Sequence, residues 1–179
     1  MLAGKNLMLV AHPDDETIFG YTLLRRKNWH VVCLTHAQTK PRCDEFRSVL
    51  EKIGVTGQMM DYPDIWGGGF DEAQTTAELR ELVQAGQYDH VVTHNAEGEY
   101  GHSQHCALHK IVLEVVERDL FVFAPGSELV SFDLLREKLE VLNLYQSQKN
   151  LGLFEWRPPR TPHDTMMKYV VSEGVRRIK

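Results

Sequence analysis

Residues 6–16 have the sequence NLMLVAHPDDE, in which a short apolar run stops abruptly at a cluster of polar side chains. The residues that follow, 17–27, have the composition of a helix. A strand, a polar loop and a helix therefore succeed one another at the start of the chain. This is the unit from which parallel α/β sheets are built.

The same alternation continues along the chain. Short β-branched runs at 30–35 and 89–94 are each followed by a segment with apolar residues at helical spacing, at 44–53 and 103–118. A less regular unit lies between them. It has a strand at 58–62, a loop containing Gly67, Gly68 and Gly69, and a helix over 72–85.

The C-terminal part predicts two further strands, at 120–124 and 128–132, and a helix over 134–149 that Asp133 caps. No linker or repeat divides the sequence, so residues 1–179 are interpreted as one domain. The predicted class is α/β, with a Rossmann-like, open and mostly parallel sheet that has helices on both faces.

Composition excludes several classes of protein. The chain has 179 residues, 20 Lys and Arg against 25 Asp and Glu, and 42% hydrophobic residues, which is enough for a core. With a net charge of −5 and no basic stripe, no nucleic-acid partner is expected. There is no membrane segment or signal peptide, and the three cysteines lack CxxC spacing, so we expect a cytoplasmic protein.

Two polar clusters follow predicted strands, at residues 11–16 and 94–105. Open parallel sheets bind their ligands outside the carboxyl ends of the strands, where both clusters should lie. His12 and Asp15 are three residues apart, as are His102 and His105. Two histidines and one carboxylate are the protein ligands of many catalytic zinc ions, which keep a fourth position for water.

Other interpretations use the same residues. The acidic residues at 14–16 are also explained if they serve merely to stabilise the first turn of a helix. His105 and His109 also have metal-ligand spacing, so periodicity leaves the third ligand open. A set of two histidines and a carboxylate also occurs in non-haem Fe(II) enzymes, and a non-catalytic sugar- or nucleotide-binding domain is a third alternative. A dinucleotide site is disfavoured because the first turn has no GxGxxG. The remaining histidines considered are interpreted as polar residues that meet solvent: His30, His36, His90 and His163.

Two motifs carry a resemblance to a known family. AHPDDE at 11–16 and GEYGHSQH at 98–105 resemble the LmbE-like (PIG-L) family of metal-dependent N-acetylglucosaminyl deacetylases. RCDE at 42–45 and the segment from Lys138 to YQSQ at 145–148 are similar to two helices of that family. The resemblance covers residues from about 6 to about 150.

The resemblance implies roles for particular residues. The implied metal ligands are His12, Asp15 and His105; the implied catalytic groups are Asp14 as general base, His102 as a second catalytic group and Tyr100 as an oxyanion donor. His102 would either stabilise the oxyanion or protonate the amine. Arg42 would contact the sugar, as would an aspartate after the third strand, for which Asp64 is preferred to Asp61.

The resemblance therefore implies a hydrolase that removes the N-acetyl group of a small N-acetylated sugar or glycoconjugate. Its implied cofactor is Zn²⁺, although Fe²⁺ and Co²⁺ can occupy such ligands, and a homo-oligomer is compatible with the sequence. Trp66 adjoins the three glycines and is interpreted either as part of a lid over the sugar or as a core residue.

Overall fold

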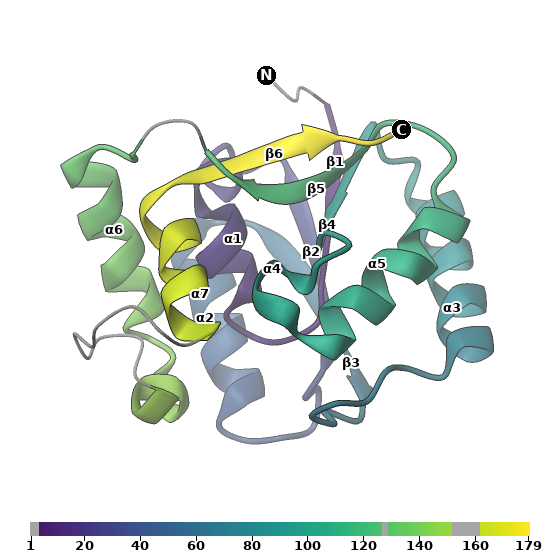
Figure 1. Ribbon diagram of the computed structural model, residues 1–179, viewed down its shortest axis with the longest axis horizontal. Coiled ribbons are helices and arrows are strands. Elements are labelled where there is room, and N and C mark those ends of the chain that lie inside the picture. Colours follow the sequence, from purple (N-terminus) through teal and green to yellow (C-terminus); the bar gives the residue numbers. More distant parts are fainter. Residues whose placement is uncertain (1–3, 127–128, 152–161) are drawn as a thin grey trace.

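A six-stranded sheet forms the centre of the computed structural model, which describes residues 4–126, 129–151 and 162–179 (Figure 1). Its strands, in the spatial order β3-β2-β1-β4-β5-β6, are β3 (Thr56–Tyr62), β2 (Trp29–Thr35), β1 (Asn6–Val10), β4 (His90–Thr93), β5 (Leu120–Pro125) and β6 (Glu173–Arg177). β1 to β5 are parallel, and β6 pairs antiparallel with β5. The predicted α/β class with a mostly parallel sheet is confirmed.

Helices cover both faces of the sheet (Figure 1). One face carries α1 (Asp15–Leu24), α2 (Arg42–Ile53), α6 (Phe132–Leu142) and α7 (Pro162–Val171), and the other carries α3 (Glu72–Gly86) and α5 (Ser103–Val115). A short helix, α4 (Gly98–Gly101), precedes α5, and the 3₁₀ helix η1 (Gln146–Leu151) follows α6. Within the described part of the chain, no helix is both long and apolar enough to cross a bilayer.

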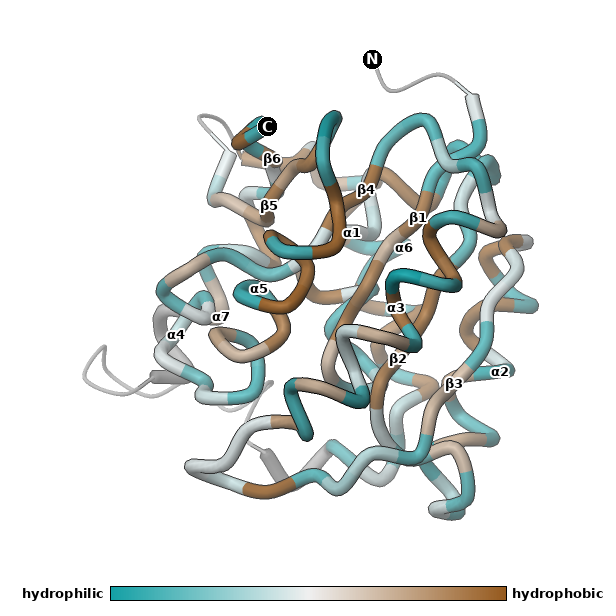
Figure 2. The backbone as a smooth tube through the Cα atoms, turned by 90° about the vertical axis from the view of Figure 1, so that its right-hand side faces the viewer, coloured by the Kyte–Doolittle hydropathy of each residue, from teal (hydrophilic) through white to brown (hydrophobic). Residues whose placement is uncertain are grey.

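Side chains of β1 show why the sheet has two cores. Met8 and Val10 belong to the core under α1 and α2, whereas Leu7 and Leu9 belong to the core under α3 and α5. All four are fully buried, because successive residues of a strand point to opposite faces and helices cover both of these faces. A central parallel strand therefore carries apolar residues on both faces, as residues 7–10 of β1 do, and Figure 2 shows most of β1 in the brown of hydrophobic residues.

Two C-terminal predictions are wrong. Of the strand expected at 128–132, the described residues are coil up to the start of α6, where Leu129 and Phe132 are exposed. The edge of β5 is occupied by β6, so this apolar run has no strand to pair with. The following helix is α6, which ends at Leu142 instead of continuing to residue 149, and Ser131 caps it instead of Asp133.

The strand order defines where a ligand can bind. From β1 the chain proceeds through β2 to β3 on one side, and β4 and β5 lie on the other side. The carboxyl ends of β1 and β4 therefore form the switch point at which open α/β sheets place their ligands. Both polar clusters of the sequence follow these two strands.

Candidate metal centre and active site

Loops from four parallel strands meet at the switch point. His12 lies just after β1, His36 after β2, Asp64 after β3 and His94 after β4. Asp64 lies 3.0 Å from His36 Nε2 and 3.4 Å from His12 Nε2. The sheet thus brings residues far apart in the sequence into one cluster.

The turn from β1 into α1 directs the two adjacent aspartates differently. The Asp15 carboxylate turns back and accepts the backbone N–H of His12 at 2.8 Å. Asp14 adopts a positive φ of 113°, which is rare for a residue other than glycine. Both carboxylates are buried, and only that of Asp15 contacts the histidines of the second cluster.

Three side-chain atoms form a nearly equilateral triangle. Asp15 Oδ2 lies 3.4 Å from His12 Nδ1 and 3.3 Å from His105 Nε2, and the two nitrogens are 3.2 Å apart. The ligands of a tetrahedral zinc ion, bound at about 2.0–2.1 Å, lie about 3.3–3.4 Å from one another. The triangle therefore has the dimensions of one face of a zinc site.

Hydrogen bonds on the far sides of the two rings direct their lone pairs into this triangle. Gln104 donates its amide N–H to the Pro63 carbonyl at 2.8 Å, so its oxygen faces His12 Nε2 at 3.0 Å and accepts its N–H. His105 donates Nδ1–H to Glu99 at 2.7 Å. In their neutral forms, His12 Nδ1 and His105 Nε2 are then free to bind a metal ion.

Two other sets of three possible metal ligands share residues with the triangle. Ligand atoms of His12, His102 and His105 lie within 4.8 Å of one another, as do those of Asp15, His94 and His105. His94 Nε2, however, accepts the backbone N–H of Ala11 at 3.1 Å, so its lone pair is already used. The geometry therefore favours His12, Asp15 and His105 over a set that includes His94.

His102 is packed among the other rings of the site. Its ring is stacked on His105, with centroids 4.6 Å apart, and contacts Trp66 edge to face at 5.1 Å and Tyr100 at 5.8 Å. Its Nδ1 is buried and has no hydrogen-bond partner among the residues that the structure describes. A buried polar atom of this kind marks a position where a ligand, water or ion is expected.

The electrostatics of the cluster favour a cation. Burial lowers the pKa of His12, but hydrogen bonds with Asp15 and Asp64 outweigh this and raise the pKa to about 10. Burial also opposes ionisation of Asp15, yet the neighbouring histidines, His105 above all, hold its pKa well below the usual value. A site that stabilises a proton so strongly also attracts a metal ion, which binds in place of that proton.

Asp14, Tyr100 and His102 also have shifted pKa values. Burial and the charge of Asp15 raise the pKa of Asp14 well above its usual value, and Arg42 partly opposes this. Burial, followed by the nearby carboxylates, also raises the pKa of Tyr100, so its O–H stays protonated. Burial and the charges of nearby histidines lower the pKa of His102 to about 4, so its ring is neutral at pH 7.

The three expected substrate contacts differ in their surroundings. Arg42 donates to the Pro13 carbonyl at 2.7 Å and lies 3.7 Å from the Asp14 carboxylate, so it is held beside the expected base. Asp64 lies against His12, whereas Asp61 accepts the backbone N–H of Gln38. Trp66 is 80% exposed, and the alternative that it belongs to the core is therefore wrong.

Sequence reasoning did not single out several residues around the site. His36 was expected only to meet solvent, but it bonds Asp64. Glu99, His94 and Gln104 form hydrogen bonds behind the triangle, and no spacing rule identifies them. The sequence feature that could have identified Glu99, His94 and Gln104 is their position within the second polar cluster, at 94–105.

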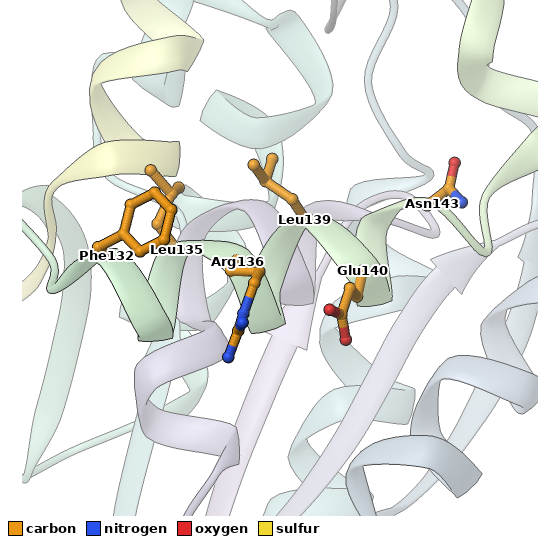
Figure 3. A pocket seen from close by; sticks show the side chains of 6 residues that line it. All are labelled: Phe132, Leu135, Arg136, Leu139, Glu140 and Asn143. Atoms are coloured by element: carbon orange, nitrogen blue, oxygen red, sulfur yellow. The ribbon is translucent and has the colours of Figure 1, made fainter.

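A separate pocket of about 420 Å³ lies along α6 (Figure 3). It is lined by Phe132, Leu135, Arg136, Leu139, Glu140 and Asn143. None of the residues at the switch point lines it, so it plays no part in the chemistry considered above.

Comparisons with known proteins identify the family and the fold. The model of the PIG-L family, described as GlcNAc-PI de-N-acetylase, matches residues 7–116, which include both polar clusters. Uncharacterized protein L374 of Acanthamoeba polyphaga mimivirus is 30% identical over 164 residues, covering 81% of this chain and 72% of that protein. The crystal structure of a deacetylase triple mutant from the teicoplanin biosynthetic pathway is similar, with a TM-score of 0.66 at 16% identity, over 92% of this chain and 88% of that one.

Proposed function

The chain belongs to the PIG-L family of GlcNAc-PI de-N-acetylases, and we propose that it is a zinc-dependent deacetylase. Its substrate is a small compound that contains an N-acetylated amino sugar, and its products are acetate and the free amine. The observation that carries the proposal is the triangle of His12 Nδ1, Asp15 Oδ2 and His105 Nε2, whose edges measure 3.2–3.4 Å. Fe²⁺ and Co²⁺ fit the same donor atoms.

Hydrolysis of an amide needs a nucleophile, a place for charge on the carbonyl oxygen and a proton for the departing nitrogen. His12, Asp15 and His105 would hold Zn²⁺, which would contribute to the nucleophile by lowering the pKa of a water molecule towards about 7 and would help to stabilise the charge by polarising the carbonyl. Asp14 accepts the proton of the attacking water, since its carboxylate is buried beside the ligands, and burial together with the charge of Asp15 raises its pKa above the usual value and makes it a stronger base.

Tyr100 and His102 suit the developing negative charge. The Tyr100 hydroxyl keeps its proton, and the neutral His102 ring offers an N–H at pH 7. A ring with a pKa of about 4 carries no spare proton, so we assign His102 to the oxyanion instead of to the amine. Asp14 then passes the proton it took from water to the amine nitrogen as the C–N bond breaks, and the acetyl group leaves as acetate.

The rim of the site offers contacts to a sugar. Asp64 is ionised, because its hydrogen bonds with His12 and His36 lower its pKa, and its carboxylate can accept bonds from sugar hydroxyls. Trp66 presents an exposed aromatic face beside His102, which can cover the apolar side of a sugar ring. Arg42 lies beside the Asp14 carboxylate and influences its charge. We also expect the Arg42 side chain to contact the sugar.

We place this activity in the cytoplasm and in a single domain. The three cysteines, Cys33, Cys43 and Cys106, are all free, as is usual in a reducing compartment.

Acetate release tests the proposal. Protein stripped of metal and resupplied with Zn²⁺ is incubated with N-acetylglucosamine, its glycosides and a nucleotide sugar that contains it. We expect acetate and free amine in equal amounts from at least one of these compounds, and loss of both with Asp14→Asn. Consumption of dioxygen with Fe²⁺ would instead indicate an oxygenase, and binding without turnover would indicate a sugar-binding domain.

A further inference from the structure

The buried carboxylate of Glu99 lies behind the metal triangle and bonds more than one element of the site. Glu99 Oε2 accepts Nδ1–H of His94 and Nδ1–H of His105, each at 2.7 Å. Its other oxygen, Oε1, accepts the backbone N–H of Asn95 at 2.8 Å. The side chains of Glu99 and both histidines are fully buried, so these bonds are not shared with solvent.

The bond to Glu99 decides which nitrogen of His105 can bind a metal ion. A neutral imidazole carries one proton, and with that proton on Nδ1 the lone pair is on Nε2. Nε2 is the atom of His105 that lies 3.3 Å from Asp15 Oδ2 and 3.2 Å from His12 Nδ1. The opposite tautomer would direct an N–H into the triangle.

His94 links the same carboxylate to the other metal-binding loop. Its Nδ1 donates to Glu99 and its Nε2 accepts the backbone N–H of Ala11, the residue before His12. Its ring also stacks on His105, with centroids 3.7 Å apart and planes inclined by 19°. Glu99 and His94 together therefore connect the loop after β1 to α5.

The backbone at Glu99 is in a conformation that few residues adopt. Its φ of 59° and ψ of −56° are close to those of a strained γ-turn. The preceding Gly98 also has a positive φ, of 62°. Strain of this kind persists where the surrounding contacts require it, and here the turn directs the carboxylate towards both imidazoles.

We infer that Glu99 is a positioning residue of the metal site, which fixes the tautomer and orientation of His105 and, through His94, aligns the two loops that carry the ligands. The inference rests on the proposed metal site at His12, Asp15 and His105. Outer carboxylates of this kind raise metal affinity because the ligand ring is already oriented before the ion arrives.

Glutamine cannot replace Glu99 without a conflict. Both oxygens of Glu99 accept N–H groups, so the amide group of a glutamine would face a donor in either orientation. If the amide nitrogen of the glutamine faced the histidines, it would meet the N–H groups of His94 and His105. If it faced Asn95, it would meet the backbone N–H of that residue. Glu99→Gln therefore disturbs the hydrogen bonds while changing the volume very little.

The experiment measures zinc affinity by competition with a chelating indicator for the wild type, Glu99→Gln and the matched control Glu97→Gln. Glu97 is exposed and lies two residues away, so the control removes the same charge without touching the triangle. We expect the Kd for Zn²⁺ to rise about 10–100-fold in Glu99→Gln and to stay unchanged in Glu97→Gln. Thermal unfolding of the metal-free proteins is measured in parallel.

The outcomes separate the inference from the proposed function. A wild type that binds no Zn²⁺ would overturn the metal site and the inference with it. A wild type that binds Zn²⁺ together with a Glu99→Gln protein of equal affinity would overturn the inference alone, and a lower melting temperature with unchanged affinity would show that Glu99 serves only folding.

A second measurement applies even if Glu99→Gln fails to fold. In zinc-loaded wild type with ¹⁵N-labelled histidine, we expect His105 to bind the ion through Nε2 and to carry a slowly exchanging proton on Nδ1. Binding of His105 through Nδ1, or the absence of that proton, would overturn the inference.

Discussion

Replacing Trp66 by alanine should weaken substrate binding while leaving the fold almost unchanged. Trp66 is 80% exposed, so only about one fifth of its surface is buried. A fully buried aromatic side chain covers about 150–250 Å², so Trp66 buries about 30–50 Å², equivalent to about 1 kcal/mol at 25 cal/mol per Å². The matched control is Trp29→Ala: Trp29 is 3% exposed, and its loss should cost about 3–5 kcal/mol.

Urea denaturation gives the stability of each variant, and steady-state kinetics of acetate release give KM and kcat. If Trp66 covers the apolar face of the sugar, losing about 0.5–1.5 kcal/mol of aromatic contact should raise KM about 2- to 12-fold. A Trp66→Ala protein with an unchanged KM would refute the contact with substrate. One destabilised as much as Trp29→Ala would refute the exposed position on which the reasoning rests.

Three further predictions follow from the buried charges. Asp14→Asn should retain the metal, measured by elemental analysis, and lower kcat by about 10²–10⁴, since it removes the base and none of the ligands; loss of metal would contradict this assignment. Arg42→Met removes a cation that lowers the pKa of Asp14, so the acidic limb of the kcat/KM profile should move to higher pH; an unchanged limb would mean that the 3.7 Å contact does not influence the base. Lys138 is fully buried and bonds Glu173, so Lys138→Met should lower the free energy of unfolding by about 3–5 kcal/mol in urea, and Lys138→Met with Glu173→Gln should recover part of it; a loss below about 1 kcal/mol would show that the pair contributes little.

The central sheet could be predicted from the sequence because local pattern and burial agree there. β1 and β2 each contain an uninterrupted run of four apolar residues, and α2 buries Phe46, Val49 and Leu50 at helical spacing. The edge of the sheet could not be predicted in this way. β6 contains two arginines and only one large apolar residue, Val175, and its pairing with β5 is decided by tertiary packing.

The site likewise contains residues that could be predicted from the sequence and residues that could not. The rule that ligands bind at the carboxyl ends of parallel strands was enough to bring the two polar clusters together. The choice of His12, Asp15 and His105 within them came from the resemblance to the family. The rule could not identify Glu99, because its role depends on a turn with a positive φ that directs the carboxylate inwards. Nor could it identify His36, whose partner Asp64 lies 28 residues away.

Titration of metal-stripped protein with Zn²⁺, while acetate release is followed, shows whether hydrolysis depends on one bound ion. We expect no acetate without metal, a rise in rate proportional to the zinc added, and a sharp break at one equivalent per chain, with no such rise in His105→Ala. Acetate release that is independent of zinc, or an equal rise in His105→Ala, would contradict the claim that hydrolysis requires one metal ion held by His12, Asp15 and His105.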